Sequence, residues 1–444
     1  MATPSRSGIF PRSFTKTYPV AVRGEGSYLW DADGNCYLDF SSSAVVSFIG
    51  HGDSDVQKAI ADQLSKLEFA HTTQFITQAA IHLANDVLTF AGPAFEGGAV
   101  FFTSGGSEAV ESALKLARQY QVEIGQRSRY RILSRHQAYH GATLGAMGVS
   151  GNRRRREIYL PMLRTSEQVN TPYCYRCVYG CKNCGERYAE EVEVALSAMG
   201  AEAAAFIFEP MSGATIGAVS PPSAYLPTVA EISSKRGVLL IADEVMTGFG
   251  RTGRNFAVEH WGVTPDIIVA GKGISSGYAP LGAVIANRKV VDAIAKGSGA
   301  LIHGFTYNAH AGSMAAGQAV LKKIVEQKLV AASDKLGSEL GSALGSLRSL
   351  RSVGDVRGRG LLWAVEFVAD KSTKAPYAAD RGFASRVGAA AAKRGVLVYP
   401  MQGCVDGIAG DHILVAPPAI ITAAQIESAV QQLKTAIEEV EQSS

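Results

Sequence analysis

Two apolar runs that each lead to a charged residue constrain this chain more than any other feature of its sequence. The first, Gly237–Ala242, ends at Asp243, and the second, Ile267–Ala270, leads through Gly271 to Lys272. Unbroken apolar runs bounded by glycine are typical of parallel strands that are covered on both faces. Open α/β sheets bind ligands at the carboxyl ends of their strands. We therefore expect an α/β fold in which Asp243 and Lys272 lie at one edge of a parallel sheet.

A carboxylate and a lysine at neighbouring strand ends form the pair that pyridoxal phosphate chemistry requires. The lysine amine forms a Schiff base with the aldehyde of the cofactor, and the carboxylate keeps the pyridine nitrogen protonated, so that the ring accepts electrons. Taken alone, Lys272 would be a solvated surface lysine and Asp243 a turn cap, because most lysines are exposed. The two stretches together favour a pyridoxal phosphate site in which Asp243 and Lys272 are the catalytic residues.

The segment from Asp243 to Gly253, Asp-Glu-Val-Met-Thr-Gly-Phe-Gly-Arg-Thr-Gly, and its spacing to Lys272 resemble the class III aminotransferase family. The similarity extends over nearly the whole chain. It implies a pyridoxal-phosphate-dependent enzyme of fold type I, similar to the ω-transaminases, with a mostly parallel central sheet in its large domain. We expect an N-terminal arm and part of a smaller α+β domain in residues 1–65. The large cofactor-binding domain is expected in 66–308 and the rest of the small domain in 309–444.

A strand followed by a turn of small residues and a helix is predicted near residue 105. The apolar run Gly98–Thr103 is the strand, and Ser104–Ala117 has the spacing of a helix. Such a turn offers free backbone N–H groups and the positive end of a helix to a phosphate, although any helix start has these donors. The family resemblance implies that Gly105, Gly106 and Ser107 bind the phosphate of the cofactor.

The resemblance assigns four further residues to the ring of the cofactor. It implies that Tyr139 stacks on one face of the ring, Val245 packs on the opposite face, and His140 and Glu209 lie beside the ring. A flat aromatic side chain suits this stacking role, although a buried core tyrosine is the alternative for Tyr139. For Glu209 the alternative is a carboxylate that caps nearby backbone N–H groups.

One expected cofactor contact comes from a second subunit. In the family, the loop equivalent to His303–His310 reaches the cofactor of the neighbouring chain, and the hydroxyl at the position of Thr306 binds its phosphate. The resemblance therefore implies a homodimer, or a higher homo-oligomer, with active sites shared between subunits.

The function that we expect from the sequence is transamination in two half-reactions with pyridoxamine phosphate between them. Lys272 would act as general base and acid, and an amino group would pass from an amine or ω-amino acid to a 2-oxo acid such as pyruvate. The same fold also supports pyridoxal phosphate lyases and mutases, and a binding protein on a decayed enzyme fold is a remote alternative. All these partners are small molecules.

The residue that would bind a substrate carboxylate is not evident from the sequence. Family members that act on ω-amino acids often have Arg directly after Tyr-His-Gly, or Glu after the Gly of the Glu-Pro motif; here these positions are Ala142 and Ala214. Amine-specific members carry an arginine before Gly-Asp-His, whereas Val405–His412 contains none. The remaining candidates are the basic run Arg153–Arg156 and Arg254.

Composition gives no reason to expect a nucleic acid or membrane partner. The chain has 444 residues, 47% hydrophobic residues and a net charge of +3. No segment resembles a signal peptide or approaches the ~20 apolar residues of a membrane span. The expectation is a cytoplasmic enzyme whose core is large enough for more than one domain.

Four of the six cysteines lie in one short polar segment, at Cys174, Cys177, Cys181 and Cys184. Two Cys-x-x-Cys pairs can hold a zinc ion through four thiolates. However, structural zinc sites usually have more than three residues between the pairs, which favours a redox-inert structural cluster over a metal site. Both interpretations stay open, and we expect no catalytic metal.

Smaller patterns predict most of the remaining elements. Asp33-Gly34 is a turn signal in a hairpin that spans Ser27–Phe40, and Thr422 is a cap for a closing amphipathic helix that ends near Val440. The other predicted elements are helices at about 53–68, 77–90 and 309–350 and strands at 130–134, 203–208, 353–367, 396–399 and 411–415.

Overall fold

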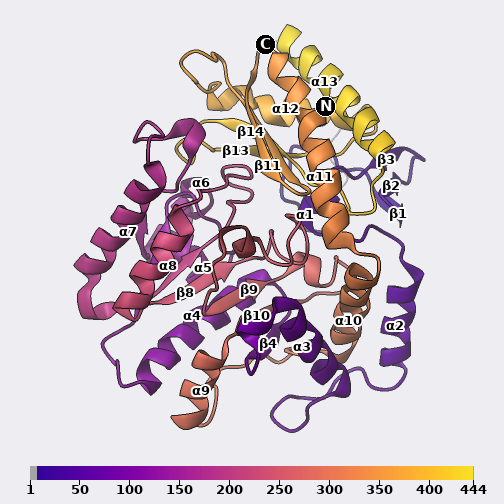
Figure 1. Ribbon diagram of the computed structural model, residues 1–444. Helices are drawn as coiled ribbons and strands as arrows, with labels where there is room; N and C mark the ends of the chain where they lie inside the picture. The colour runs from indigo at the N-terminus through magenta and orange to yellow at the C-terminus, as the bar shows by residue number, and fades with distance from the viewer. Residues whose placement is uncertain (1–7, 444) are drawn as a thin grey trace.

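A mostly parallel sheet of seven strands forms the centre of the molecule in a computed structural model that describes residues 8–443 (Figure 1). The strand order is β4-β10-β9-β8-β7-β5-β6, and β10 alone runs antiparallel to its neighbours. The first seven residues of the predicted N-terminal arm lie outside the described residues. The strands are β4 (Ala99–Thr103), β5 (Arg131–Arg135), β6 (Glu167–Val169), β7 (Ala203–Phe208), β8 (Leu239–Asp243), β9 (Ile267–Ala270) and β10 (Gly282–Ala286).

Helices cover both faces of this sheet because its strands are apolar on both sides. In β8, Leu239 and Ile241 belong to one hydrophobic cluster and Leu240 and Ala242 to another, as expected when successive side chains point to opposite faces. On the first face lie α4 (Gly106–Glu123), α5 (Leu144–Val149) and α9 (Arg288–Lys296). On the second face lie α7 (Cys184–Met199) and α8 (Tyr225–Arg236). The predicted α/β class is confirmed.

Two smaller antiparallel sheets come from the ends of the chain. The N-terminal sheet contains the predicted hairpin, in which Asn35 and Tyr37 donate hydrogen bonds to Asp31. The C-terminal sheet has the order β11-β12-β14-β13. These strands are β1 (Ala21–Glu25), β2 (Tyr28–Asp31), β3 (Cys36–Leu38), β11 (Val353–Arg359), β12 (Leu362–Phe367), β13 (Tyr399–Gln402) and β14 (Asp411–Val415).

Several C-terminal elements differ from the sequence predictions. The single helix expected over 309–350 is two helices, α10 (Ala311–Glu326) and α11 (Leu329–Gly345), because Lys328 between them adopts the left-handed conformation with a φ of 52°. The strand expected over 353–367 is a hairpin that turns at Gly360, where φ is 51°. The strand expected at 396–399 begins only at Tyr399, since Val396 forms an isolated bridge with Leu38.

The remaining helices agree more closely with the predictions. α2 (Ser54–Leu64) is shorter than expected, α3 (Gln78–Ala91) matches, and α12 (Phe383–Ala392) covers the C-terminal sheet. α13 (Ala423–Gln442) begins at the predicted Thr422, whose hydroxyl accepts the N–H of Gln425. α10 packs on α2 and α3, so the proposed domain boundaries at 65/66 and 308/309 stay predictions.

A short turn near the N-terminus has an unusual backbone. The four residues Ser42–Val45, labelled α1, all have positive φ, between 46° and 70°. Left-handed conformations are unfavourable for residues other than glycine, so the surrounding structure must hold them in place. The Oδ1 atom of Asp39 accepts the N–H of Ser43, and the hydroxyl of Ser42 donates to the carbonyl of Ala416.

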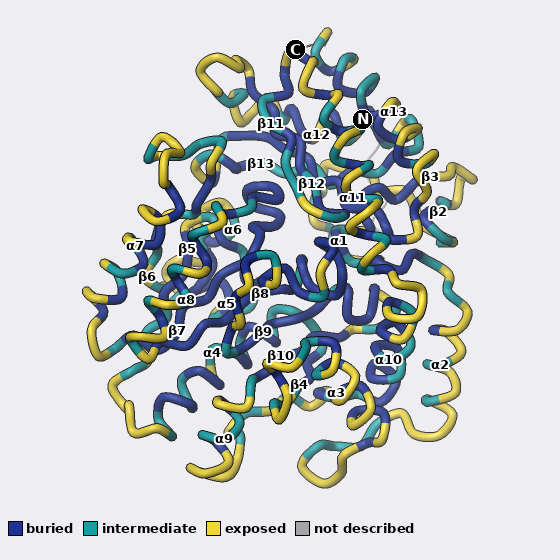
Figure 2. The backbone as a smooth tube through the Cα atoms, viewed as in Figure 1, coloured by how far each residue is buried: buried dark blue, intermediate teal, exposed yellow. Residues whose placement is uncertain are grey.

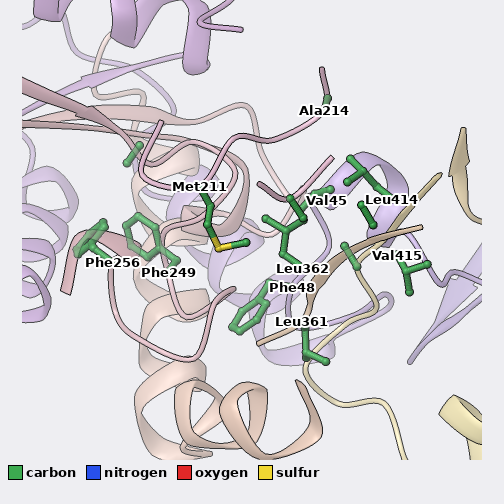
Figure 3. Packing of buried hydrophobic residues seen from close by; sticks show 14 of the residues in the cluster. Val45, Phe48, Met211, Ala214, Phe249, Phe256, Leu361, Leu362, Leu414 and Val415 are labelled. Atoms are coloured by element: carbon green, nitrogen blue, oxygen red, sulfur yellow. The ribbon is translucent and has the colours of Figure 1, made fainter. Parts of the chain in front are cut away.

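One hydrophobic core contains residues of the N-terminal segment, the central sheet and the C-terminal sheet. The strands of the central sheet are largely buried, whereas α2 exposes most of its surface (Figure 2). Figure 3 shows Val45 and Phe48 from the N-terminal segment, Met211 and Phe249 from loops of the large sheet, and Leu362 from β12 in one hydrophobic cluster. Within residues 8–443, no helix is long and apolar enough to cross a membrane.

Candidate active site

A cavity of about 180 Å³ lies at the carboxyl edge of the central sheet. Because β4, β5, β7, β8 and β9 run in the same direction, the residues that follow them meet at this edge. Every site residue predicted from the sequence lines the cavity except Gly105 and Thr306. The lining residues are Gly106, Ser107, Tyr139, His140, Gly141, Glu209, Met211, Asp243, Val245, Met246 and Lys272.

Lys272 is half-buried where the chain leaves β9. Its φ of 47° places a residue other than glycine in the left-handed region, which is a form of strain that concentrates at functional sites. Burial lowers the pKa of its amine to about 8, although the carboxylates of Asp243 and Glu209 act in the opposite direction. About a tenth of this amine is therefore neutral and nucleophilic at pH 7, far more than for an ordinary lysine, and only the neutral form attacks an aldehyde.

Asp243 is held in place by two donors. Nδ1 of His140 lies 2.7 Å from its Oδ2 atom, and the N–H of Val245 donates to its Oδ1 atom at 3.1 Å. The backbone N–H of His140 donates to the hydroxyl of Ser150, so the imidazole is itself fixed. A carboxylate can accept about four hydrogen bonds. Asp243 thus keeps acceptor capacity for a donor that enters the cavity.

Glu209 follows β7 and accepts two backbone hydrogen bonds inside the site. Its Oε2 atom accepts the N–H of Tyr139 at 3.2 Å, and its Oε1 atom accepts the N–H of Gly213 at 2.9 Å. Burial raises its pKa. The carboxylate therefore caps backbone groups, as the alternative interpretation predicted, and it also lines the cavity.

The first turn of α4 forms one wall of the cavity. A Cβ atom at Gly106 would lie 3.0 Å from the side chain of Val245, so this position has no room for a larger residue. The hydroxyl of Ser107 accepts the N–H of Ala142 at 3.0 Å, which leaves its own proton available to a ligand. Gly105 precedes the helix in an extended conformation, with a φ of 177°, and does not line the cavity.

Arg155 packs on Tyr139, one of the residues that line the cavity. Its guanidinium carbon is 4.5 Å from the centre of the Tyr139 ring, and its positive charge helps to lower the pKa of Lys272. Of its neighbours in α6 (Arg153–Arg156), Arg153 pairs with Glu157, and Arg156 donates to a backbone carbonyl, that of Ser150. The predicted alternative Arg254 lies near Asp334, in another part of the molecule.

Thr306 is exposed and lies outside the cavity. It stands in a loop whose apolar side chains Ile302 and Tyr307 are also exposed, together with Phe75 and Ile76 of a neighbouring segment. The hydrogen bond from Thr72 to Asn308 joins these two segments. Within this chain, Thr306 is therefore not a part of the cavity.

Sequence reasoning missed three lining residues, Gly141, Met211 and Met246. Gly141 completes the Tyr-His-Gly motif with a φ of 138°, and a Cβ atom there would lie 2.7 Å from the Ser107 hydroxyl. The two methionines directly follow the Glu-Pro and Asp-Glu-Val motifs, so proximity to predicted residues was the available signal.

The residues of the cavity fit pyridoxal phosphate. The free N–H groups of the α4 start and the Ser107 hydroxyl are donors for a phosphate. The remaining acceptor capacity of Asp243 suits a protonated ring nitrogen, and the partly neutral amine of Lys272 suits an aldehyde. These three groups are the ones that the cofactor requires, and all of them face one cavity.

Comparison with known proteins shows the family to which the chain belongs. The sequence model described as Aminotransferase class-III matches residues 9–437. An uncharacterized aminotransferase YodT of Bacillus subtilis (strain 168) is 37% identical over 96% of this chain and 96% of its own length.

Solved structures of the same fold include two transaminases. A transaminase from the marine bacterium Virgibacillus has a TM-score of 0.92 and 33% identity, over 99% of this chain and 98% of its own. A PLP-bound amine transaminase from an uncultivated Pseudomonas species has a TM-score of 0.92 and 34% identity, over 99% of this chain and 100% of its own. The fold is therefore that of the fold-type I transaminases, and the chain belongs to the class III aminotransferase family of pyridoxal-phosphate-dependent enzymes.

Proposed function

We propose that this enzyme transfers an amino group from an amine or ω-amino acid to a 2-oxo acid such as pyruvate. The observation that carries the proposal is the half-buried Lys272, whose amine has a pKa of about 8 and shares one cavity with Asp243 and the α4 start. The similarity to a structure described as an amine transaminase supports the choice of donor.

In this proposal, Lys272 holds the cofactor and moves protons during the reaction. Pyridoxal phosphate, when bound, supplies an electron-accepting ring that stabilises negative charge on the substrate carbon. Asp243 keeps this ring protonated because His140 and the Val245 N–H fix its orientation. Once the substrate releases the amine of Lys272, the amine removes the proton from the substrate carbon and delivers it to a second carbon, as general base and then general acid.

We further propose that Arg155 binds the carboxylate of the 2-oxo acid, and of the donor where it has one. Arg155 is half-buried against Tyr139, and no carboxylate of the described residues forms an ion pair with it. Ala142 and Ala214 stand where carboxylate-binding relatives carry charged residues, which leaves this role vacant. Arginine suits it because the planar guanidinium binds a carboxylate through two hydrogen bonds.

The proposed assembly is a homodimer in which Thr306 contacts the cofactor phosphate of the partner subunit. Phe75, Ile76, Ile302 and Tyr307 are between 64 and 79% exposed in the single chain, around the loop that carries Thr306. Exposed apolar side chains grouped in this way are typical of a protein interface. In a dimer, a second copy of the chain would cover these side chains. The loop that carries Thr306 would then lie beside the cavity of that second copy.

The stoichiometry of the isolated half-reaction tests the proposed function. The loaded enzyme is mixed with an amine donor such as 1-phenylethylamine in the absence of a 2-oxo acid. A transaminase releases one equivalent of carbonyl product per site and then stops, with no free ammonia. Addition of pyruvate should produce one equivalent of alanine and restore the absorbance of the starting enzyme.

The same experiment separates the alternative reactions of the fold. A lyase would release ammonia, phosphate or carbon dioxide over many turnovers without a 2-oxo acid, and a mutase would isomerise its substrate without release of an amine. Either result overturns the proposal.

A further inference from the structure

Three cysteine thiols converge in the loop that precedes α7. The sulfur atoms of Cys174, Cys181 and Cys184 all lie within 4.8 Å of one another, and those of Cys174 and Cys184 are 4.0 Å apart. A zinc ion with four tetrahedral bonds of ~2.3 Å separates its sulfur ligands by about 3.8 Å. The three thiols therefore have nearly the spacing of a zinc site before any ion is added.

The backbone of the loop brings these thiols together. Cys174 begins a short 3₁₀ turn, Cys174–Arg176, and Cys184 is the first residue of α7. Between them, Gly180, Cys181 and Asn183 have φ values of 74°, 59° and 52°, which fold the chain back on itself. The thiol of Cys181 then donates to the carbonyl oxygen of Cys174 at 3.0 Å.

Cys177 stands in the same turn, outside the group of three thiols, and is the candidate for a fourth ligand. Its sulfur accepts the backbone N–H of Cys181 at 3.3 Å and the hydroxyl of Tyr188 at 3.7 Å. Backbone N–H groups and the start of a helix stabilise negative charge on sulfur, as thiolate ligands need. Lys182 and Arg187 add positive charge to this segment, which would offset the charge of four thiolates.

A disulfide does not account for this arrangement. All six cysteines are free, and the 4.0 Å between the sulfurs of Cys174 and Cys184 is a van der Waals contact, well above the ~2.05 Å of a disulfide bond. Thiolate ligands in a tetrahedral array select zinc among the common divalent cations.

We propose that Cys174, Cys181 and Cys184, completed by Cys177, bind a structural zinc ion. Four protein ligands leave no open position on the metal, and none of the four cysteines lines the catalytic cavity. The ion would instead stabilise the loop between β6 and α7, which contacts the C-terminal sheet. In this loop, Arg176 pairs with Glu366 of β12 at 2.7 Å, and the carbonyl of Tyr175 accepts a hydrogen bond from Lys374 at 2.7 Å.

The metal content of the purified protein tests this site. Wild type, Cys174→Ser/Cys184→Ser and the matched control Cys36→Ser are produced with zinc in the medium and measured by plasma mass spectrometry as loaded enzymes. We expect about one zinc per chain in wild type and in the control, and less than about a tenth of that in the double variant. Zinc that persists in the double variant, or is absent from wild type after reconstitution under reducing conditions, overturns the proposal.

A second measurement on wild type covers the case in which the double variant does not fold. Reduced, metal-free enzyme is reconstituted with Co²⁺, which gives strong thiolate-to-metal charge-transfer absorption when it is bound by cysteine sulfur. These bands are expected, and zinc should displace them. If the bands are missing, or if alkylation of the purified wild type without reductant shows a disulfide within residues 174–184, the zinc proposal is wrong.

Discussion

Two buried carboxylates, Asp243 and Glu366, show how the proposed catalytic site differs from a structural one. Glu366 lies in β12, where Arg176 and Arg357 contact it at 2.7 and 2.8 Å and the hydroxyl of Tyr173 donates to it. Asp243 has two donors, His140 and the Val245 N–H, and its remaining acceptor capacity faces a cavity. Burial alone therefore does not mark a reactive site in this protein; unused hydrogen-bonding capacity beside a cavity does.

Both carboxylates are flanked by groups with perturbed pKa values. Burial raises the pKa of Glu366, and its two guanidinium partners offset the unfavourable energy of the buried charge. Burial lowers the pKa of Lys272 beside Asp243. The difference predicts that changes around Asp243 mainly reduce catalysis, whereas changes around Glu366 mainly reduce stability.

The largest effect should follow the replacement Lys272→Ala. Loss of both the covalent attachment and the proton transfer should lower the rate of transamination by at least about 10⁴-fold. The rate is measured with saturating donor and pyruvate, and the exposed Lys296→Ala serves as the matched control. The assignment of Lys272 fails if the variant still gives a borohydride-reducible adduct with the cofactor.

Glu366→Gln should instead destabilise the fold. At pH 9, above the raised pKa of Glu366 of about 8, two partly buried guanidinium groups would lose their charged partner, and breaking such a pair lowers the free energy of unfolding by about 3–5 kcal/mol. Urea unfolding measures the change, with Glu439→Gln, at an exposed ion pair with Arg394, as the control. A fall in the rate per folded enzyme at unchanged stability would remove the distinction between the two carboxylates.

Replacement of Arg155 tests whether this residue binds the carboxylate of the substrate. Arg155→Gln should raise the KM for pyruvate and for ω-amino acid donors by about 10–100-fold, the range for hydrogen bonds to a charged group. The KM for a donor without a carboxylate should not change. Arg153→Gln, on the exposed face of the same turn, is the control, and an equal effect on both donor classes would contradict the proposed role of Arg155.

Thr306→Val should weaken retention of the cofactor by about 1–2 kcal/mol, the scale of one hydrogen bond to a charged group. Equilibrium dialysis of the cofactor measures the change. A sharper experiment mixes two inactive variants, Lys272→Ala and Thr306→Arg, and allows their subunits to exchange. With shared sites, one site of each heterodimer carries both lesions and the other carries neither, so activity should partly return. If subunits exchange and no activity returns, Thr306 does not act on the partner subunit.

The pH dependence of cofactor capture should give the smallest effect. Burial lowers the pKa of Lys272 to about 8, and only the neutral amine attacks an aldehyde. Between pH 7 and pH 9 the neutral fraction, and with it the capture rate at a fixed concentration of reactive cofactor, should rise about tenfold. Stopped-flow absorbance measures this rate.

The amine of Lys272 also makes the stability of the cofactor-free protein depend on pH. Its pKa in the folded chain is below that of the unfolded chain, so the unfolded state binds more protons between about pH 8 and pH 10. Stability from this group should therefore rise with pH across that window, and its unfavourable contribution should be complete below pH 8. In Lys272→Met this rise should disappear; an unchanged pH profile would argue against the lowered pKa.

The sequence predicted β4, β5, β7, β8 and β9 of the central sheet and most of the residues that line the cavity because both follow from local pattern, whereas β6 and β10 were not predicted. Apolar runs indicated β8 and β9, and the fixed direction of parallel strands placed Asp243 and Lys272 at one edge. The Glu366 cluster was not predicted, because its partners Tyr173 and Arg176 are about 190 residues away in the chain and no local pattern links them to Glu366.

Errors in the C-terminal region also have a physical cause. The residues around Lys328 keep a helical pattern, so a single left-handed residue divides two helices without a proline or glycine to mark it. Arg155 was one of several arginines in a run, and only the packing against Tyr139 distinguishes it. The division of the two helices and the position of Arg155 therefore depend on tertiary contacts, which the local sequence pattern does not specify.

The backbone conformation of Lys272 has a consequence for how this enzyme tolerates change. A left-handed φ and a buried amine both oppose folding, so a glycine at this position would relieve the first and remove the second. A laboratory selection for heat resistance that ignores activity would therefore favour loss of the lysine that we propose as the catalytic residue. Substitutions intended to raise the thermal stability of this enzyme should leave Lys272 unchanged and should be placed on the exposed faces of helices such as α2 and α9.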